Sequence, residues 1–129
     1  MEFDIATFDA ILYGVMNTAA MASSLYSART THDVFRYYFE KYEKYMHNPH
    51  PRIRREQIAR IARDMPYLWM DGDHGYGWID PDEYPPIIDL HFVTNYRDCD
   101  YNINHFFSGK IREMRFYEMQ AGYRVKAGR

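Results

Sequence analysis

Carboxylates, glycines and aromatic rings are concentrated between residues 69 and 86, in the stretch WMDGDHGYGWIDPDEYPP. Carboxylate oxygens bind hard cations such as Ca²⁺, glycine-rich loops cradle phosphates, and acidic surfaces with aromatic rings contact basic proteins. The stretch therefore raises three hypotheses: a metal-binding loop, a phosphate-binding loop, or a surface that contacts a protein.

The metal hypothesis fails on spacing. Asp71 and Asp73 stand at the first and third places of a calcium-loop frame, but Tyr76 and Asp82 stand where an EF-hand loop has glycine and a bidentate glutamate. The aromatic runs on either side of the DGDHG segment are typical of strands rather than of a helix pair. We interpret DGDHG as a polar turn and expect no metal ion there.

The remaining chemistries are also poorly supported. His47 and His50 are separated by Pro49, so they do not share a helical face. The glycines match no nucleotide-binding motif, and the neighbouring carboxylates would repel phosphate. Cys99 lies between two aspartates, which disfavour a thiolate. We therefore expect a protein that is not an enzyme, with no catalytic residue and no cofactor; a metal-dependent hydrolase is the second alternative.

The third hypothesis assigns two groups of residues to a partner-binding surface. The acidic group would supply charge complementary to a basic partner; it consists of Asp71, Asp73, Asp80, Asp82 and Glu83. The aromatic group would supply the anchors that become buried in an interface; it consists of Trp69, Tyr76, Trp78 and Tyr84.

Charge is strongly segregated along a chain whose net charge is only −2. The acidic segment 64–100 lies between two basic segments, 34–63 and 101–129. Direct nucleic-acid binding through helices 52–63 and 110–129 is therefore the first alternative. Its candidate residues are Arg52, Arg54, Arg55, Arg60, Arg63, Lys110, Arg112 and Arg115.

Length and composition predict one domain spanning residues 1–129, because 129 residues of which 47% are hydrophobic can form one sizeable core. The single cysteine fits a reducing compartment. The uncharged run 10–28 contains too many serines for a membrane span, and the acidic residues before it exclude a signal peptide. We expect a cytoplasmic protein with no membrane contact.

Apolar periodicity and turn residues predict a mainly α fold, with about five helices in one compact bundle and a small β-hairpin near 67–79. The helices are expected at 3–28, 30–46, 52–65, about 82–96 and 101–119. The first is expected to be central in the core, with a homodimer seam as the alternative. Thr30 or Thr31 would cap the second helix, and Asp100 the fifth.

The fifth helix has two further expected features. Its inward face would consist of Ile103, Phe107, Ile111 and Met114, and Ser108–Gly109 can kink or split it. The tail after residue 119 is expected to be frayed and basic.

The stretch DCDYNINHFFSGKIREMRFYE, residues 98–118, resembles the C-terminal part of small uncharacterised reading frames carried by bacterial mobile elements or prophages. The likeness is confined to this stretch and contains no catalytic motif. It implies a mobile-element origin, and small proteins of that origin often bind host machinery, including CRISPR nucleases.

These observations converge on a non-catalytic binding protein. The leading hypothesis is an inhibitor or modulator of a basic, nucleic-acid-handling protein, such as a CRISPR nuclease. Its acidic, aromatic-flanked surface would enter a groove that normally holds phosphates.

Overall fold

The computed structural model describes residues 26–71, 75–108 and 111–127. Within these ranges the chain forms five α-helices, one short 3-10 helix and one two-stranded antiparallel sheet. The helix expected at 3–28 lies almost wholly outside the described residues. The prediction of a mainly α bundle with a small hairpin is confirmed.

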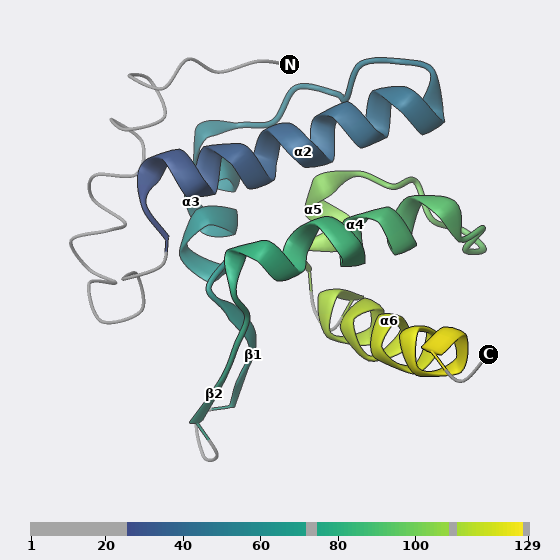
Figure 1. Cartoon of the computed structure of the whole chain (residues 1–129). Coiled ribbons are helices and arrows are strands. Elements are labelled where there is room, and N and C mark those ends of the chain that lie inside the picture. Colours follow the sequence, from purple (N-terminus) through teal and green to yellow (C-terminus); the bar gives the residue numbers. More distant parts are fainter. Residues whose placement is uncertain (1–25, 72–74, 109–110, 128–129) are drawn as a thin grey trace.

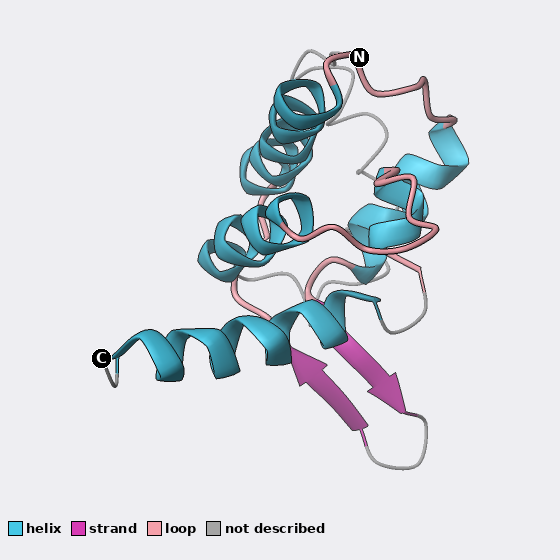
Figure 2. Cartoon of the chain, turned by 90° about the vertical axis from the view of Figure 1, so that its right-hand side faces the viewer, coloured by secondary structure: helices cyan, strands magenta, loops and turns pink. Residues whose placement is uncertain are grey.

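Helices α2 (Ala28–Met46) and α4 (Tyr84–Val93) run side by side in the same direction (Figure 1). Helices α3 (Arg55–Asp64) and α5 (Ile103–Phe106) lie behind them, and α6 (Ile111–Ala127) crosses beneath both layers (Figure 2). Strands β1 (Tyr67–Asp71) and β2 (Gly75–Trp78) form a hairpin that projects from the bundle on the α6 side.

The core is formed by buried side chains of α2, α3, α4 and α5, with Leu68 of β1 and Ile79 after β2. In α4 the buried residues recur at helical spacing: Tyr84, Ile87, Ile88, His91 and Phe92. In α3 and the residue after it, Ile58, Ile61, Ala62 and Met65 are buried. Tyr38 of α2 is fully buried among these elements, and its hydroxyl donates a hydrogen bond to the carbonyl of Tyr101 at 2.7 Å.

Two predicted caps are wrong. Ser27, rather than Thr30 or Thr31, caps α2, because its Oγ accepts the Thr30 N–H at 3.1 Å. Asn102, rather than Asp100, caps α5 by accepting the Asn104 N–H at 2.8 Å. In each case the chain begins to coil one or more residues away from the position that the prediction chose, and another short polar side chain meets the free N–H groups.

The split expected at Ser108–Gly109 is present, and it changes which residues face the core. Helix α5 ends at Phe106 and α6 begins at Ile111, so the two segments do not share one helical phase. Ile103 and Phe107 are buried as expected, but Met114 is 49% exposed. The prediction of an inward Met114 is wrong because it assumed one continuous helix.

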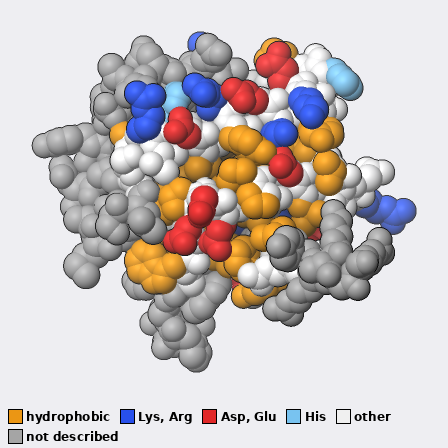
Figure 3. Space-filling model, viewed as in Figure 1, with side chains coloured by type: hydrophobic (Ala, Val, Ile, Leu, Met, Phe, Trp, Pro, Cys, Tyr) orange, Lys and Arg blue, Asp and Glu red, His pale blue; other side chains and the backbone are white. Residues whose placement is uncertain are grey.

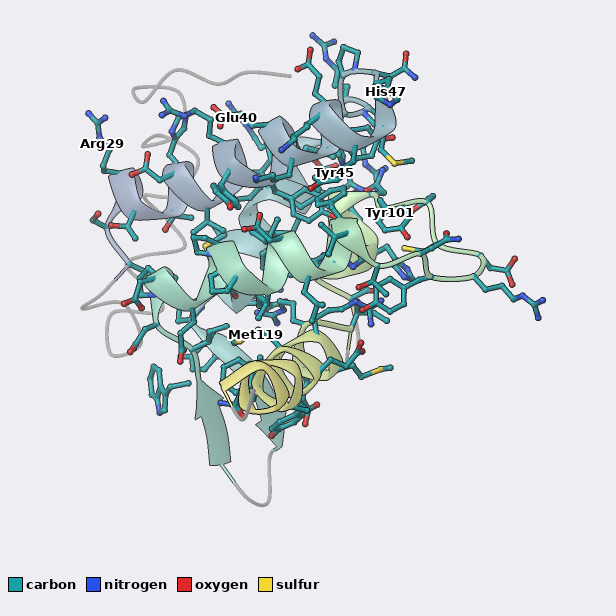
Figure 4. All side chains as sticks on the ribbon, turned by 45° about the vertical axis from the view of Figure 1, so that its right-hand side comes forward. Arg29, Glu40, Tyr45, His47, Tyr101 and Met119 are labelled. Atoms are coloured by element: carbon teal, nitrogen blue, oxygen red, sulfur yellow. The ribbon has the colours of Figure 1, made fainter. Side chains whose placement is uncertain are left out.

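Ile111 packs against the core, as expected, and the rest of the inward face of α6 is formed by residues at spacings of three, one and three: Arg112, Arg115, Phe116 and Met119. The side chains of Arg29 and Glu40 on α2 show the opposite placement, since both point away from the bundle (Figure 4).

The tail expected to be frayed continues as helix to Ala127, in a segment that contains no proline.

Candidate functional site

The hairpin carries the first half of the expected partner-binding surface. Its strands pair with Trp69 opposite Gly77, Met70 opposite Tyr76 and Asp71 opposite Gly75. Trp69, Asp71 and Tyr76 therefore lie on the strands, with Asp71 at their far end, whereas Asp73 lies outside the described residues. Strands flank the turn on both sides, so it lacks the helix pair of an EF-hand.

The second half of that surface begins where the hairpin returns to the bundle. Trp78 is 56% exposed, and its ring packs against that of Tyr67 with centroids 5.1 Å apart. The chain then enters the 3-10 helix η2 (Pro81–Glu83), where the Asp80 N–H donates to Glu83 Oε2 at 2.8 Å. This turn holds three carboxylates within four residues: Asp80, Asp82 and Glu83.

The charges of these three carboxylates are not neutralised within the described parts of the chain. None of them forms an ion pair with another described residue. Asp80 and Asp82 are exposed, and Glu83 is partly so. We use the name acidic surface for Trp78, Asp80, Asp82 and Glu83. Figure 3 shows acidic side chains gathered next to hydrophobic ones on the face that α2 and α4 form.

Tyr84, the last of the expected aromatic anchors, is not at the surface. Its side chain is fully buried, and its hydroxyl donates to the Met65 carbonyl and accepts from Arg112 Nη1 at 2.8 Å. Burial raises the pKa of Tyr84, although the Arg112 guanidinium opposes the rise. The expectation that Tyr84 contacts a partner is corrected: it lies on the inward face of α4 and belongs to the core.

Arg112 is only 6% exposed, so it is not available to a nucleic acid. Its Nη1 also donates to the Asp64 carbonyl at 3.2 Å, and its guanidinium lies over the Phe107 ring at 4.9 Å from the centroid. The arginine thus connects α6 with the end of α3 and the start of α4. This placement corrects the expectation that Arg112 belongs to a basic binding face.

Arg115 is 3% exposed and is likewise removed from that face. Its Nε donates to His91 Nδ1 at 3.0 Å, its Nη1 lies 3.2 Å from Glu118 Oε1, and its guanidinium stacks 3.4 Å from the Tyr96 ring centroid. Because His91 Nδ1 accepts, the imidazole is neutral and carries its proton on Nε2, which has no hydrogen-bond partner among the described residues. Burial, then the charges of Arg115 and His105, lower the pKa of His91 to about 3.

The other candidate basic residues remain accessible in part. Arg52, Arg54, Arg55 and Arg63 are exposed around α3. Arg60 is half-buried and donates to Asn104 Oδ1 of α5 at 3.2 Å, so it joins two helices. Lys110 lies outside the described residues. The candidate basic residues that are exposed therefore lie on α3 and in the residues just before it.

Within residues 26–71, 75–108 and 111–127, no group of three or more His, Cys, Asp or Glu side chains could hold a metal ion. Both ring nitrogens of His50 are engaged, since Nδ1 donates to the Pro51 carbonyl at 2.7 Å and Nε2 accepts the Ile103 N–H at 2.9 Å.

No helix in the described part of the chain is long and apolar enough to cross a membrane.

A cavity between α2 and the start of α4 was not anticipated from the sequence. Its α2 wall consists of Thr30, Asp33, Val34 and Tyr37, which share one helical face. The sequence shows that these four residues share a helical face. It does not show that η2 and α4 lie opposite them and form the other wall of the cavity.

Comparisons with known proteins add no information about this site. No protein-family model, no curated protein and no solved structure matches the chain.

Proposed function

We propose that the protein is a non-catalytic binding protein whose acidic surface contacts a basic, nucleic-acid-handling protein and modulates it. One observation carries the proposal: Trp78 is 56% exposed, and within the next five residues follow Asp80, Asp82 and Glu83, which form no ion pair with a described residue. An exposed tryptophan bordered by charge has the features of an interface hot spot.

The charge pattern supports a particular mode of action. A groove that binds a nucleic-acid backbone is lined with Lys and Arg, and three carboxylates within four residues offer it a negatively charged substitute for phosphates. Opposite charges accelerate association and fix orientation, while the tryptophan ring supplies apolar contact area. A protein bound in this way would exclude the nucleic acid and inhibit its partner.

The resemblance of residues 98–118 to mobile-element reading frames makes a nuclease the first class of partner to test, and CRISPR nucleases the first example. The resemblance supplies no contact residue. The proposal depends on the acidic surface and applies to any basic protein that presents a phosphate-binding groove.

Direct nucleic-acid binding is the second candidate, and the exposed arginines of residues 52–63 favour it. Arg52, Arg54 and Arg55 cluster at the start of α3, and Arg63 lies on its exposed side. With Arg112 and Arg115 buried, this candidate has fewer cations than the sequence indicated. Its affinity for DNA or RNA would fall steeply as salt rises.

The test compares two sets of charge reversals in affinity capture from a bacterial lysate, with and without nuclease treatment. The first set is Asp80→Lys with Asp82→Lys and Glu83→Lys; the matched control set is Glu40→Lys with Glu43→Lys, two exposed acids of α2. We expect nuclease-resistant capture of a basic protein by the wild type and the control, and its loss with the first set.

The purified partner must then lose its nucleic acid when the wild-type protein is added. Capture that disappears after nuclease treatment, or that is lost with Arg54→Glu and Arg63→Glu but kept with the acidic-surface set, would replace the proposal with direct nucleic-acid binding.

A further inference from the structure

The cavity between α2 and α4 has a volume of about 330 Å³ and a largely apolar wall. The apolar wall is formed by the side chains of Val34, Tyr37, Pro81, Pro85 and Ile88. Thr30 and Tyr84 also line the cavity, and two carboxylates do so from different helices, Asp33 from α2 and Asp82 from η2. The cavity therefore combines an apolar interior with negative charge contributed from two separate elements.

The two carboxylates have no partner among the described residues. Neither Asp33 nor Asp82 forms a hydrogen bond or an ion pair there, and both side chains are exposed. Two cations of α2 are paired with other carboxylates: Lys41 Nζ lies 3.4 Å from Asp89 Oδ1 and 5.3 Å from the centroid of the Tyr37 ring, and Arg36 Nε lies 3.5 Å from Glu40 Oε1. Arg29 forms no ion pair with a described residue, and its side chain points away from the bundle (Figure 4). Among the residues that the structure describes, no cationic side chain lines the cavity.

We infer that this cavity receives an arginine or lysine side chain of the basic partner, an inference that rests on the proposed function. The aliphatic stem of such a side chain packs against apolar walls while its charged end stays at the polar rim. Here the charged end would meet Asp33 and Asp82. Arginine fits better than lysine, because a guanidinium is weakly hydrated, stacks on aromatic rings such as Tyr37 and donates to two carboxylates at once.

Other occupants fit the lining less well. A phosphate or carboxylate would be repelled by Asp33 and Asp82, and a wholly apolar side chain would cover the two charges without pairing them. Asp82 belongs both to the acidic surface and to the cavity, so the two sites are continuous through η2. A basic peptide segment on the acidic surface therefore lies within reach of the cavity.

The test titrates the isotope-labelled full chain with the peptide acetyl-Ala-Ala-Arg-Ala-Ala-amide and follows backbone amide shifts. A peptide with citrulline in place of arginine has nearly the same shape without the charge. We expect saturable millimolar binding of the arginine peptide, with the largest shifts at Val34, Tyr37 and Ile88. The citrulline peptide should bind at least about fivefold more weakly, since it lacks the charge-assisted hydrogen bonds.

Substitution of each cavity carboxylate shows whether its charge contributes to peptide binding. Asp33→Asn and Asp82→Asn should each weaken the arginine peptide about three- to fivefold, as expected for partly exposed ion pairs. The matched control is Glu43→Gln, which removes an exposed charge from α2 outside the cavity and should change the affinity less than twofold by the same reasoning. Asp33, Asp82 and Glu43 are exposed, so these substitutions should leave the fold intact.

Several results would overturn the inference. They are the absence of saturable shifts, equal binding of the arginine and citrulline peptides, or equal effects of Asp33→Asn and Glu43→Gln. Binding of free n-butylguanidinium as tightly as the peptide would reassign the cavity to a small cation and also overturn it.

The results that contradict this inference differ from those that contradict the proposed function. Partner capture that survives Asp33→Asn but is lost with Asp80→Lys and Glu83→Lys, two residues that do not line the cavity, leaves the acidic surface intact and removes only the cavity's role.

Discussion

Arg115 Nε donates a hydrogen bond to His91 Nδ1 at 3.0 Å between two side chains that are 3% and 0% exposed. A permanent cation thus lies against an imidazole that must stay neutral to accept from it. The contact joins α6 to α4, and Arg112 makes a parallel connection through Tyr84. These two arginines attach α6 to the bundle.

Protonation of His91 at low pH should destabilise the fold. Its pKa is about 3 in the folded protein, below the ordinary value of 6.5, because of burial, Arg115 and His105. The unfolded chain takes up the proton near pH 6.5 while the folded chain does not. The stabilisation is therefore complete above pH 6.5 and is lost as the pH falls toward 3.

Urea unfolding at pH 7, 6 and 5 measures this loss. The wild type should lose about 2 kcal/mol of unfolding free energy from this group between pH 7 and pH 5. His91→Gln, which keeps a hydrogen-bond acceptor, should show a correspondingly shallower pH dependence. Parallel profiles for the two proteins would contradict the prediction.

Removal of the Arg112 guanidinium should also destabilise the fold. Arg112→Met leaves the Asp64 carbonyl and the buried Tyr84 hydroxyl without their donor, so we expect a loss of about 2–4 kcal/mol of unfolding free energy. The matched control Arg63→Met removes an exposed arginine at the end of α3 and should cost less than about 0.5 kcal/mol. Equal costs in chemical denaturation would show that Arg112 is not structural.

Ser27 should be the residue on which the start of α2 depends. Its Oγ accepts the Thr30 N–H, so Ser27→Ala should cost about 1 kcal/mol, and Ser27→Asp should restore most of that loss. Thermal unfolding of the two variants beside the wild type measures the difference. A larger effect of Thr30→Ala than of Ser27→Ala would return the cap to the position predicted from the sequence.

His50 should protect one particular backbone amide. Its Nε2 accepts the Ile103 N–H at 2.9 Å from the start of α5, and burial lowers the pKa of His50. In His50→Leu, hydrogen exchange at the Ile103 amide should accelerate by at least about tenfold, as expected for the loss of one hydrogen bond. Exchange at Ile61, which lies in the core of α3, should accelerate less. Uniform acceleration at both amides would indicate global destabilisation instead.

The sequence by itself determined where the helices and the hairpin form. Helical periodicity identified α2, α3 and α4, and two short aromatic runs around a glycine-rich turn identified the hairpin. It also located the split near Ser108–Gly109. These features depend on side-chain spacing and on glycine and proline, which act within a few residues and can be recognised in the sequence.

Only the tertiary structure decided which polar residues lie inside. The break between α5 and α6 resets the helical phase, so Met114 faces outward while Arg112 and Arg115 face inward. Their guanidiniums can be buried because segments far away in the sequence supply hydrogen-bond acceptors: the Asp64 carbonyl, the Tyr84 hydroxyl and His91 Nδ1. The cavity between α2 and η2 arises in the same way. A charged residue is buried or exposed according to the partners that the fold brings to it, and those partners are far away in the sequence.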